Sequence, residues 1–557
     1  MPVDSRLVPY PPDDVERYLA SGAWDAAPVA QRFHEVAREF GSRTALIDQQ
    51  GSISYTDLDL RSDQIAAAFI ERGITPGAPI LFQVGNSIPA VAAWYGVLKA
   101  GAIPVATLAG HRAHEIGSIA GIVGAVGHIV DDSRPDRFDM VEFGAQQARA
   151  NRTLRHLFTV GSRRTHRDPA VAPIEGLGAS LDPREARQRV EAVQRTLGPQ
   201  DVAVHQLSGG TTGVPKVIPR LHGEYWNNAR AWALALGRTE FSVTCHAAPI
   251  IHNAGISCAL HSTHSVGGAL VLAPPDRSIA LRMMAEHRVD DTLFVHGMFS
   301  WIMSEEYEAA ARHLQTVILS GAKVPDEVFA RVERFGARVG QTFGMGEGMF
   351  ALTPFDAPRE LRKTTVGTPL TTGDEIRILD PGGERELPDG HTGELACRGW
   401  YTIRGYFDSP EHNATAFTAD GFYRTGDLAR VQRHDGKPFL SIEGRIKDLI
   451  NRGGEKVNAG ELELLLHQHP AIDDVAVVAM PDPRLGERVC AYLVTGEAAL
   501  GIPALQAHLE TLGVAKYKWP ERVEIIDALP RTQVGKIDKK ALRADIAAKL
   551  APPVISA

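Results

Sequence analysis

The sequence predicts a protein of the α/β class with more than one domain. Short apolar runs alternate with helical patterns over residues 40–110, as in TALIDQ, PILFQV and IPAVAAWYGVLKAG, and the same alternation returns over residues 200–345. This rhythm is typical of mostly parallel sheets covered by helices. With 557 residues, the chain is too long for a single hydrophobic core. We therefore expect two α/β sheet subdomains and additional smaller parts.

The first of these regions contains three predicted strands and two predicted helices. TALIDQ, ISYTDL and PILFQV resemble strands, while LRSDQIAAAFIERG and IPAVAAWYGVLKAG have a helical composition. In the second region AVHQLSGG, GALVLAPP, DTLFVHG and TVILSGA are short strands that end in small residues. Between the two regions, residues 162–200 are rich in Arg, Pro, Gly and Ala. We expect a surface linker there.

The character of the chain changes after about residue 375. EIRILD, GELACRG, FYRTGD and FLSIEGR are short strands punctuated by Gly and Asp, which indicates a β-rich subdomain. Beyond Arg445, the segments GELELLLHQHP and PALQAHLETLG are helical, and DVAVVAMP, VCAYLVT and RVEIIDAL are strands. We predict an N-terminal core domain of residues 1–445 and a small α+β domain of residues 446–557.

Composition argues against several classes of partner. The net charge of -8 provides no basic excess for nucleic-acid phosphates or for an anionic membrane surface. The richest apolar stretch, residues 88–110, is interrupted by Lys99, glycines and prolines, unlike a membrane span. Four widely separated cysteines predict neither a disulfide framework nor a structural zinc site. The opening MPVDSRLVPYPPDD lacks a signal-peptide pattern, so we expect a cytoplasmic protein.

A glycine-rich segment, LSGGTTGVPK at residues 207–216, is the strongest local motif. Glycines let backbone N–H groups approach an oxyanion closely, hydroxyl groups add donors, and a lysine adds charge, so the segment suits a polyphosphate. It is not a Walker A loop, because the G-K-[ST] ending is missing. Taken alone, an ordinary turn explains it equally well. The residues concerned are Ser208, Gly209, Gly210, Thr211, Thr212, Gly213 and Lys216.

Four further motifs follow in order: QTFGMGE (341–347), YRTGD (423–427), GRIKDLINRGGEKV (444–457) and PRTQVGK (530–536). Each one alone has a plain structural explanation, as a turn, a core aromatic or a solvated charge. Together with the glycine-rich segment, they make the chain closely similar to the adenylate-forming superfamily of acyl-CoA synthetases, nonribosomal peptide adenylation domains and beetle luciferases. The resemblance covers nearly the whole chain. It implies ATP and Mg²⁺ as cofactors and a mobile C-terminal domain.

The resemblance also implies a role for each motif residue. The segment from Ser208 to Gly213, with Lys216, would hold the β- and γ-phosphates, and Glu347 would bind Mg²⁺. Asp427 would accept hydrogen bonds from the ribose, and Arg445 would approach the ribose–phosphate region. The residues expected around the adenine are Phe343 and Gly344, with Gly321 and Ala322 forming the adjacent wall.

The C-terminal domain would act in two orientations. Lys536 would lie between the substrate carboxylate and the α-phosphate and offset the charge that builds there. Lys447 occupies the position where this superfamily pivots its C-terminal domain. In the second orientation the Gly453–Gly454 loop would face a thiol. That thiol would belong to a separate carrier protein bearing phosphopantetheine, or to coenzyme A.

The stretches YTIRGY, EHNATAF and YKWPERVE resemble stand-alone aryl-acid AMP ligases, which activate 2,3-dihydroxybenzoate or salicylate in siderophore and related biosynthesis. Asn253 stands where amino-acid-activating domains carry an Asp, so an ortho-hydroxy or ortho-amino aryl acid is favoured. Cys258, typical of salicylate activators, weakens the case for a 3-hydroxyl contact. His252 is assigned with Lys536 to the catalytic group, as a side chain that closes the aryl pocket or faces the phosphates.

Several pocket positions depart from the family pattern, as Ala254 does where a tyrosine is usual. They indicate a remodelled pocket, for example for a 3-hydroxyanthranilate or a hydroxyquinoline carboxylate, unless Phe350 refills the volume that Ala254 opens. An aryl-CoA ligase is the first alternative, because Arg452 and Lys456 lie near the expected coenzyme A route. An inactive acyl-adenylate-binding or scaffold protein is the second. The other unusual positions are Thr342 and Gly346.

Overall fold

The computed structural model describes residues 4–133, 138–161, 170–208, 215–321, 324–452, 455–497, 500–532 and 535–550. The chain forms two compact units. Unit 1 comprises residues 1–375 and 397–423, and unit 2 comprises residues 376–396 and 424–557. Unit 2 therefore includes the strand segments that precede residue 446. The predicted division at 445/446 stays a prediction.

The first sheet of unit 1 has seven strands in the order β7-β6-β5-β3-β4-β8-β9. All neighbours are parallel except β8 and β9, which are antiparallel. All five residues of β3 are buried, as expected for a central strand covered on both faces. The strands are β3 (Pro79–Gln83), β4 (Ile103–Val105), β5 (Gly127–Asp131), β6 (His156–Val160), β7 (Val171–Pro173), β8 (Val202–Leu207) and β9 (Val217–Leu221).

The second sheet has nine strands in the order β16-β15-β14-β13-β12-β10-β11-β1-β2. Strand β1, from the start of the chain, pairs in parallel with β11, so the two sheets interleave along the sequence. The strands are β1 (Thr44–Asp48), β2 (Gly51–Ser54), β10 (Val243–His246), β11 (Ala269–Leu272), β12 (Asp291–Val295), β13 (Thr316–Ser320), β14 (Arg338–Gly344), β15 (Phe350–Leu352) and β16 (Thr368–Pro369).

Two predictions need correction. In ISYTDL the first two residues are strand and the last four are helix, because the Ser54 side chain accepts a hydrogen bond from the Asp57 N–H (3.1 Å) and so begins helix α3 (Tyr55–Glu71). The expected linker at 162–200 contains β7 and helix α7 (Pro183–Gln194). The α7 helix buries Ala186 and Val190, which an exposed linker would not.

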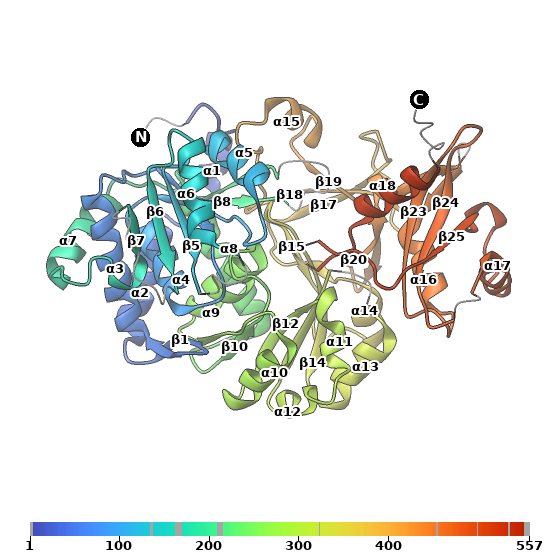
Figure 1. Ribbon diagram of the computed structural model, residues 1–557, viewed down its shortest axis with the longest axis horizontal. Helices are drawn as coiled ribbons and strands as arrows, with labels where there is room; N and C mark the ends of the chain where they lie inside the picture. Colours follow the sequence, from blue (N-terminus) through green and yellow to red (C-terminus); the bar gives the residue numbers. More distant parts are fainter. Residues whose placement is uncertain are drawn as a thin grey trace. The chain divides into compact units, whose positions relative to one another are not determined.

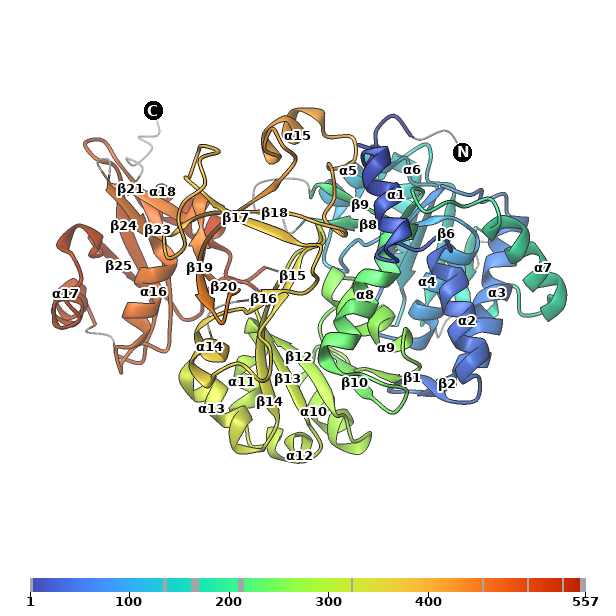
Figure 2. The same ribbon diagram turned by 180° about the vertical axis from the view of Figure 1, so that it is seen from behind.

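Helices cover both faces of the first sheet. In Figure 1, α6 (Met140–Ala150) lies in front of β5 and β6, whereas Figure 2 brings α2 (Val29–Phe40), α3 and α4 (Ile88–Lys99) to the front. The other helices of unit 1 are α1 (Pro12–Ala20), α5 (Ala113–Val123), α8 (His222–Leu236), α9 (Ser262–His264), α10 (Arg277–Glu286), α11 (Phe299–Ile302), α12 (Tyr307–Ala311), α13 (Asp326–Arg334), α14 (Arg359–Thr364) and α15 (Pro410–Ala416).

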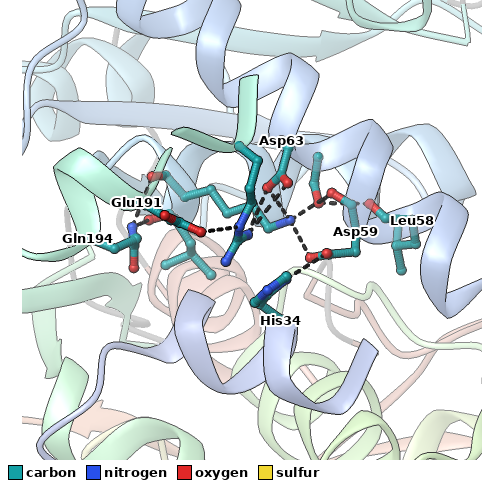
Figure 3. Close-up of polar contacts among 10 residues, drawn as sticks. His34, Leu58, Asp59, Asp63, Glu191 and Gln194 are labelled. Atoms are coloured by element: carbon teal, nitrogen blue, oxygen red, sulfur yellow. Dashed lines mark hydrogen bonds and ion pairs between the residues drawn. The ribbon is translucent and has the colours of Figure 1, made fainter. Parts of the chain in front are cut away.

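A buried ionic network joins α2, α3, α4 and α7 (Figure 3). Lys99, which is 0% exposed, pairs with Asp59 (2.5 Å) and Asp63 (2.7 Å) on α3. His34 Nδ1 lies 2.7 Å from Asp59 Oδ2, and Arg187 lies 3.2 Å from Asp63. A buried cation needs such partners, because leaving it unpaired costs several kcal/mol. This explains why a lysine interrupts the apolar α4 sequence.

Unit 2 contains two antiparallel-rich sheets. The first has the order β17-β18-β19-β20, and the second has the order β22-β21-β24-β23 with β25 beside β24. This arrangement confirms the predicted α/β fold class with a β-rich subdomain and a smaller α+β domain. The elements are β17 (Glu375–Leu379), β18 (Gly393–Arg398), β19 (Tyr423–His434), β20 (Lys437–Arg445), β21 (Leu449–Arg452), β22 (Glu455–Asn458), β23 (Asp474–Asp482), β24 (Gly486–Val494), β25 (Arg522–Ile525), α16 (Ala459–His467), α17 (Ile502–Thr511) and α18 (Lys539–Leu550).

Candidate active site

A π-helix over Ala254–His261 carries two of the predicted substrate residues. Asn253 precedes its first residue, and Ala254 and Cys258 lie within it. This helix type was not predicted from the sequence; it is rare and is found most often at functional sites. The helix approaches the preceding loop so closely that a Cβ at Gly255 would lie 2.2 Å from the Ile250 carbonyl oxygen.

The Asn253 side chain is buried in a hydrogen-bond network. Its Oδ1 accepts from the Tyr225 hydroxyl (3.1 Å) and the Ser257 hydroxyl (3.2 Å), and its Nδ2 donates to the Met345 carbonyl (3.3 Å). The Gln206 amide donates in turn to the Tyr225 oxygen (3.0 Å). The network thus joins β8, α8, the π-helix and the loop after β14. Asn253 was predicted from the sequence, but its two side-chain partners, Tyr225 and Ser257, were not.

Cys258, Thr342 and Phe350 are buried on neighbouring elements. Cys258 and Phe350 belong to one apolar cluster with Trp232, whose ring centroid lies 5.5 Å from that of Phe350. The Thr342 hydroxyl donates to the Ala351 carbonyl (2.7 Å). Burial raises the pKa of the Cys258 thiol to about 12, so the thiol stays protonated and is a weak hydrogen-bond partner.

Two buried arginines, neither of which was predicted from the sequence, donate hydrogen bonds to backbone carbonyls of the predicted pocket residues. Arg238 pairs with Asp291 (2.5 Å) and donates to the Cys258 carbonyl (2.7 Å). Arg220 pairs with Glu224 (2.6 Å) and donates to the Gly346 carbonyl (2.9 Å). A Cβ at Gly346 would lie 2.8 Å from Ile218 Cδ1, so a larger residue there would require the end of this side chain to move.

The predicted phosphate loop starts and ends on paired strands. Ser208 N–H donates to the Lys216 carbonyl (2.9 Å), and Lys216 N–H donates to the Ser208 hydroxyl (3.0 Å). These bonds continue the antiparallel pairing of β8 and β9 and close the base of the loop. The predicted loop residues Gly209, Gly210, Thr211, Thr212 and Gly213 lie outside the described residues.

Glu347 lies beside two tyrosines that the sequence analysis did not assign. The Tyr406 hydroxyl donates to Glu347 Oε1 (2.6 Å) and lies 2.8 Å from the Tyr423 hydroxyl. Burial and the charge of Glu347 raise the pKa of Tyr406 and of Tyr423 well above the ordinary value, so both hydroxyls stay protonated. The Lys216 ammonium lies 5.4 Å from the Tyr406 ring centroid, which brings the loop base to the same place.

The other predicted site residues of unit 1 lie at strand ends or at the start of the π-helix. Phe343 is half-buried and Gly344 is exposed near the end of β14, and Gly321 (φ 98°) follows β13. His252 is exposed one residue before Asn253, where its Nδ1 accepts from the Ala254 N–H (3.3 Å). Ala254 is half-buried. Ala322 lies outside the described residues.

In unit 2, Asp427 and Arg445 face each other across β19 and β20 and form an ion pair of 2.8 Å. Asp427 is buried, whereas the Arg445 side chain is 44% exposed. Lys447 lies in a single 3₁₀ turn, Ile446–Asp448, that links the two sheets of the unit. Lys536 is exposed in a turn whose ends are held by the Thr532 N–H bond to the Lys536 carbonyl (2.7 Å). Gly453 and Gly454 are not among the described residues.

Two family models match the chain, one described as an AMP-binding enzyme over residues 33–407 and the other as an AMP-binding enzyme C-terminal domain over residues 461–536. The chain belongs to the AMP-binding enzyme family. The resemblance predicted from the motifs is therefore confirmed. The residue roles that it implies stay predictions.

Curated relatives of this AMP-binding enzyme match over nearly full length. A salicylyl-CoA synthase / salicylate adenylyltransferase of a Streptomyces species is 37% identical, covering 96% of this chain and 97% of the relative. The 2,3-dihydroxybenzoate-AMP ligase of Bacillus subtilis is 35% identical, covering 98% of each. The apo structure of Mycobacterium smegmatis MbtA is 33% identical with a TM-score of 0.71, covering 97% and 99% of the two chains.

None of the helices in the described parts of this AMP-binding enzyme combines the length and the apolar character needed to cross a bilayer.

The site residues also fit a divalent cation. Glu347 is 7% exposed, and a carboxylate buried to this degree is stabilised by a nearby cation. A carboxylate together with phosphate oxygens is the set of ligands that Mg²⁺ prefers.

Proposed function

We propose that this enzyme converts an aromatic carboxylic acid with an ortho-hydroxyl or ortho-amino group into its aryl adenylate, with release of pyrophosphate. The observation that carries this proposal is the neutral Asn253 amide. This amide is buried and hydrogen-bonded to hydroxyl groups. Its network includes Gln206, two residues before Ser208, and Met345, two residues before Glu347. A neutral amide can bind an ortho substituent, but it has no charge to hold the ammonium of an amino acid.

The cofactors would be ATP and Mg²⁺. Ser208 and Lys216, at the base of the loop, would orient the polyphosphate, and Glu347 would hold the metal with its Oε1 fixed by Tyr406. Mg²⁺ bound there would supply positive charge to the phosphate oxygens. We place the reaction in the cytoplasm, where ATP is available.

The chemistry would depend on positioning and charge. The substrate carboxylate is already ionised at neutral pH, so no general base is required. Lys536 would offset the negative charge that builds when this carboxylate attacks the α-phosphate. Asp427 would accept hydrogen bonds from the ribose, with Arg445 fixing one of its oxygens at 2.8 Å. His252, exposed at the start of the π-helix, would close the aryl pocket or face the phosphates.

In the second step the acyl group would pass to the phosphopantetheine thiol of a separate carrier protein, in siderophore or other secondary-metabolite biosynthesis. The names of the relatives leave the acceptor open, because one is called a salicylyl-CoA synthase and another a salicyl-S-ArCP synthetase. Arg452, a residue on the expected coenzyme A route, pairs with Glu521 (2.8 Å). The side chain of Lys456 lies outside the described part of the chain.

Pyrophosphate exchange across a panel of acids tests the first step. The panel contains salicylate, 2,3-dihydroxybenzoate, benzoate, 3-hydroxyanthranilate, a quinoline carboxylate and several amino acids. Exchange with an ortho-substituted aryl acid is the expected result. Exchange with amino acids alone would contradict the role of Asn253, and no exchange with any acid would favour a scaffold protein. Product analysis with coenzyme A and with a phosphopantetheinylated carrier protein then identifies the acceptor.

A further inference from the structure

The direction of the hydrogen bonds around Asn253 is fixed by a backbone group. The Met345 carbonyl can only accept, so the side-chain atom that lies 3.3 Å from it must be the amide nitrogen. The amide oxygen then faces the hydroxyls of Tyr225 and Ser257 at 3.1 and 3.2 Å. The Asn253 amide cannot be reversed, because its oxygen would then face the Met345 carbonyl oxygen, and both atoms are acceptors.

Tyr225 is held in the same sense. The Gln206 amide nitrogen donates to the Tyr225 oxygen (3.0 Å), which leaves the tyrosine proton to bond Asn253 Oδ1. Burial raises the pKa of Tyr225 to about 12, so this proton remains in place throughout the physiological range. The donors therefore run in one direction, from Gln206 through Tyr225 to Asn253.

These bonds determine what Asn253 can offer to a bound acid. Both lone pairs of Oδ1 are used by the two hydroxyls, and one of the two amide hydrogens is used by Met345. The second amide hydrogen is the group that Asn253 has for a ligand. Asn253 is 5% exposed, so water competes weakly for this bond.

Ortho-hydroxy and ortho-amino acids differ at this point. In an ortho-hydroxybenzoate, the hydroxyl proton bonds the acid's own carboxylate and leaves an oxygen lone pair directed outward. In an ortho-aminobenzoate, one N–H bonds the carboxylate and a second N–H is directed outward. The first presents an acceptor to the Asn253 N–H, and the second presents a donor to a donor. A buried donor left without an acceptor costs about 1–3 kcal/mol.

We propose that Gln206, Tyr225 and Ser257 are positioning residues that make Asn253 a donor-only group, so that the enzyme selects an ortho-hydroxy acid and rejects an ortho-amino acid. This inference rests on the proposed function and narrows its substrate class. Ser257 lies on the π-helix with Cys258, and Tyr225 lies on α8 with Trp232, so the same two elements hold the polar network and the apolar cluster.

The test compares salicylate, anthranilate and benzoate in pyrophosphate exchange with the full-length enzyme and with Tyr225→Phe and Ser257→Ala. For the unmodified enzyme we expect kcat/KM to fall at least about 30-fold from salicylate to anthranilate, with benzoate between them. Each variant leaves one lone pair of Asn253 Oδ1 without its donor, so this oxygen can accept from the ortho-amino N–H, and the preference for salicylate over anthranilate should fall about tenfold, mainly through a lower KM for anthranilate. Tyr55→Phe is the matched control, because Tyr55 is buried and donates to the Gly268 carbonyl (2.6 Å) elsewhere in unit 1.

Each outcome bears on a different claim. Equal use of anthranilate and salicylate by the unmodified enzyme, or an unchanged ratio in both variants, would overturn the inference. If the thermal melting curve shows that Tyr225→Phe does not fold, the ratio of kcat/KM for salicylate and anthranilate in Ser257→Ala alone tests the inference. An absence of exchange with every aryl acid would instead contradict the proposed function, so the two failures are distinguishable.

Discussion

Asn253 and Glu347 of unit 1 and the cationic residues Arg445 and Lys536 of unit 2 differ in how firmly they are held. In unit 1, Asn253 and Glu347 are at most 7% exposed and are bonded to buried hydroxyl groups. In unit 2, Arg445 is 44% exposed, and Lys536 is exposed in a short turn. Rigid, buried groups suit the recognition of one acid, because a small displacement would weaken selection. Exposed groups on turns suit a domain that moves into and out of the active site.

The largest effect that we expect is acid unfolding of unit 1. Six histidines of unit 1 are at most 2% exposed, and burial lowers the pKa of each to about 3 or 4. The unfolded chain takes up these protons near pH 6.5, so the stabilisation is complete above that pH and is lost as the pH falls toward 4. At pH 5.5 the loss is about 1.4 kcal/mol per histidine. The residues are His128, His205, His222, His246, His261 and His264.

Hydrogen exchange at pH 7.5 and at pH 5.5, corrected for the intrinsic exchange rate, measures the loss of stability in each unit separately. The described histidines of unit 2 are all half-buried or exposed. Protection should therefore fall more in peptides from unit 1. An equal loss in both units would show that the buried histidines do not set the acid sensitivity.

Replacing Lys536 should separate the two chemical steps. Lys536→Ala removes the ammonium expected at the α-phosphate, and pyrophosphate exchange should fall about 10²–10³-fold. Thiol transfer from preformed aryl adenylate should be spared, because Lys536 would be withdrawn in that step. Lys540→Ala, in the same exposed region, is the control. Loss of both steps together in Lys536→Ala would argue against two orientations of the C-terminal domain.

Tyr406→Phe should weaken metal binding without abolishing it. The change removes the hydroxyl that fixes Glu347 Oε1 at 2.6 Å, and lost support of a metal ligand typically costs 10–100-fold in metal affinity. The Mg²⁺ dependence of exchange and the binding of Mn²⁺, measured by electron paramagnetic resonance with ATP present, report the change. Tyr401→Phe, which removes a buried bond of 3.3 Å to the Ala23 carbonyl, is the control and should leave both unchanged.

The smallest effect should come from the pair in unit 2. Arg445→Ala should change the free energy of unfolding by less than about 1 kcal/mol, because a half-exposed ion pair contributes little. Its effect should appear as a higher KM for ATP, since Asp427 loses the group that orients it. Urea denaturation and exchange kinetics measure the two quantities. A large loss of stability would mean that Arg445 is structural.

The sequence predicted the elements better than the contacts. Strands such as PILFQV were found because they are continuously apolar, and all five residues of β3 are buried. The π-helix was missed because its composition does not differ from that of an α-helix. Tyr406 was missed for another reason. Its partner Glu347 is 59 residues away, and no spacing in the sequence reports a contact that folding alone creates. Tyr423 had a weaker signal, since it begins the YRTGD motif.

The interleaved sheets of unit 1 affect how the chain is made. β1 leaves the ribosome early, but its parallel partner β11 begins at Ala269, so synthesis must continue for on the order of ten seconds or more before the two can pair. During that time β1 can pair with its neighbour β2, but its other edge stays unpaired on the nascent chain. We therefore expect heterologous yield to depend on chaperone supply and growth temperature. Fragments that end between the two strands should be insoluble.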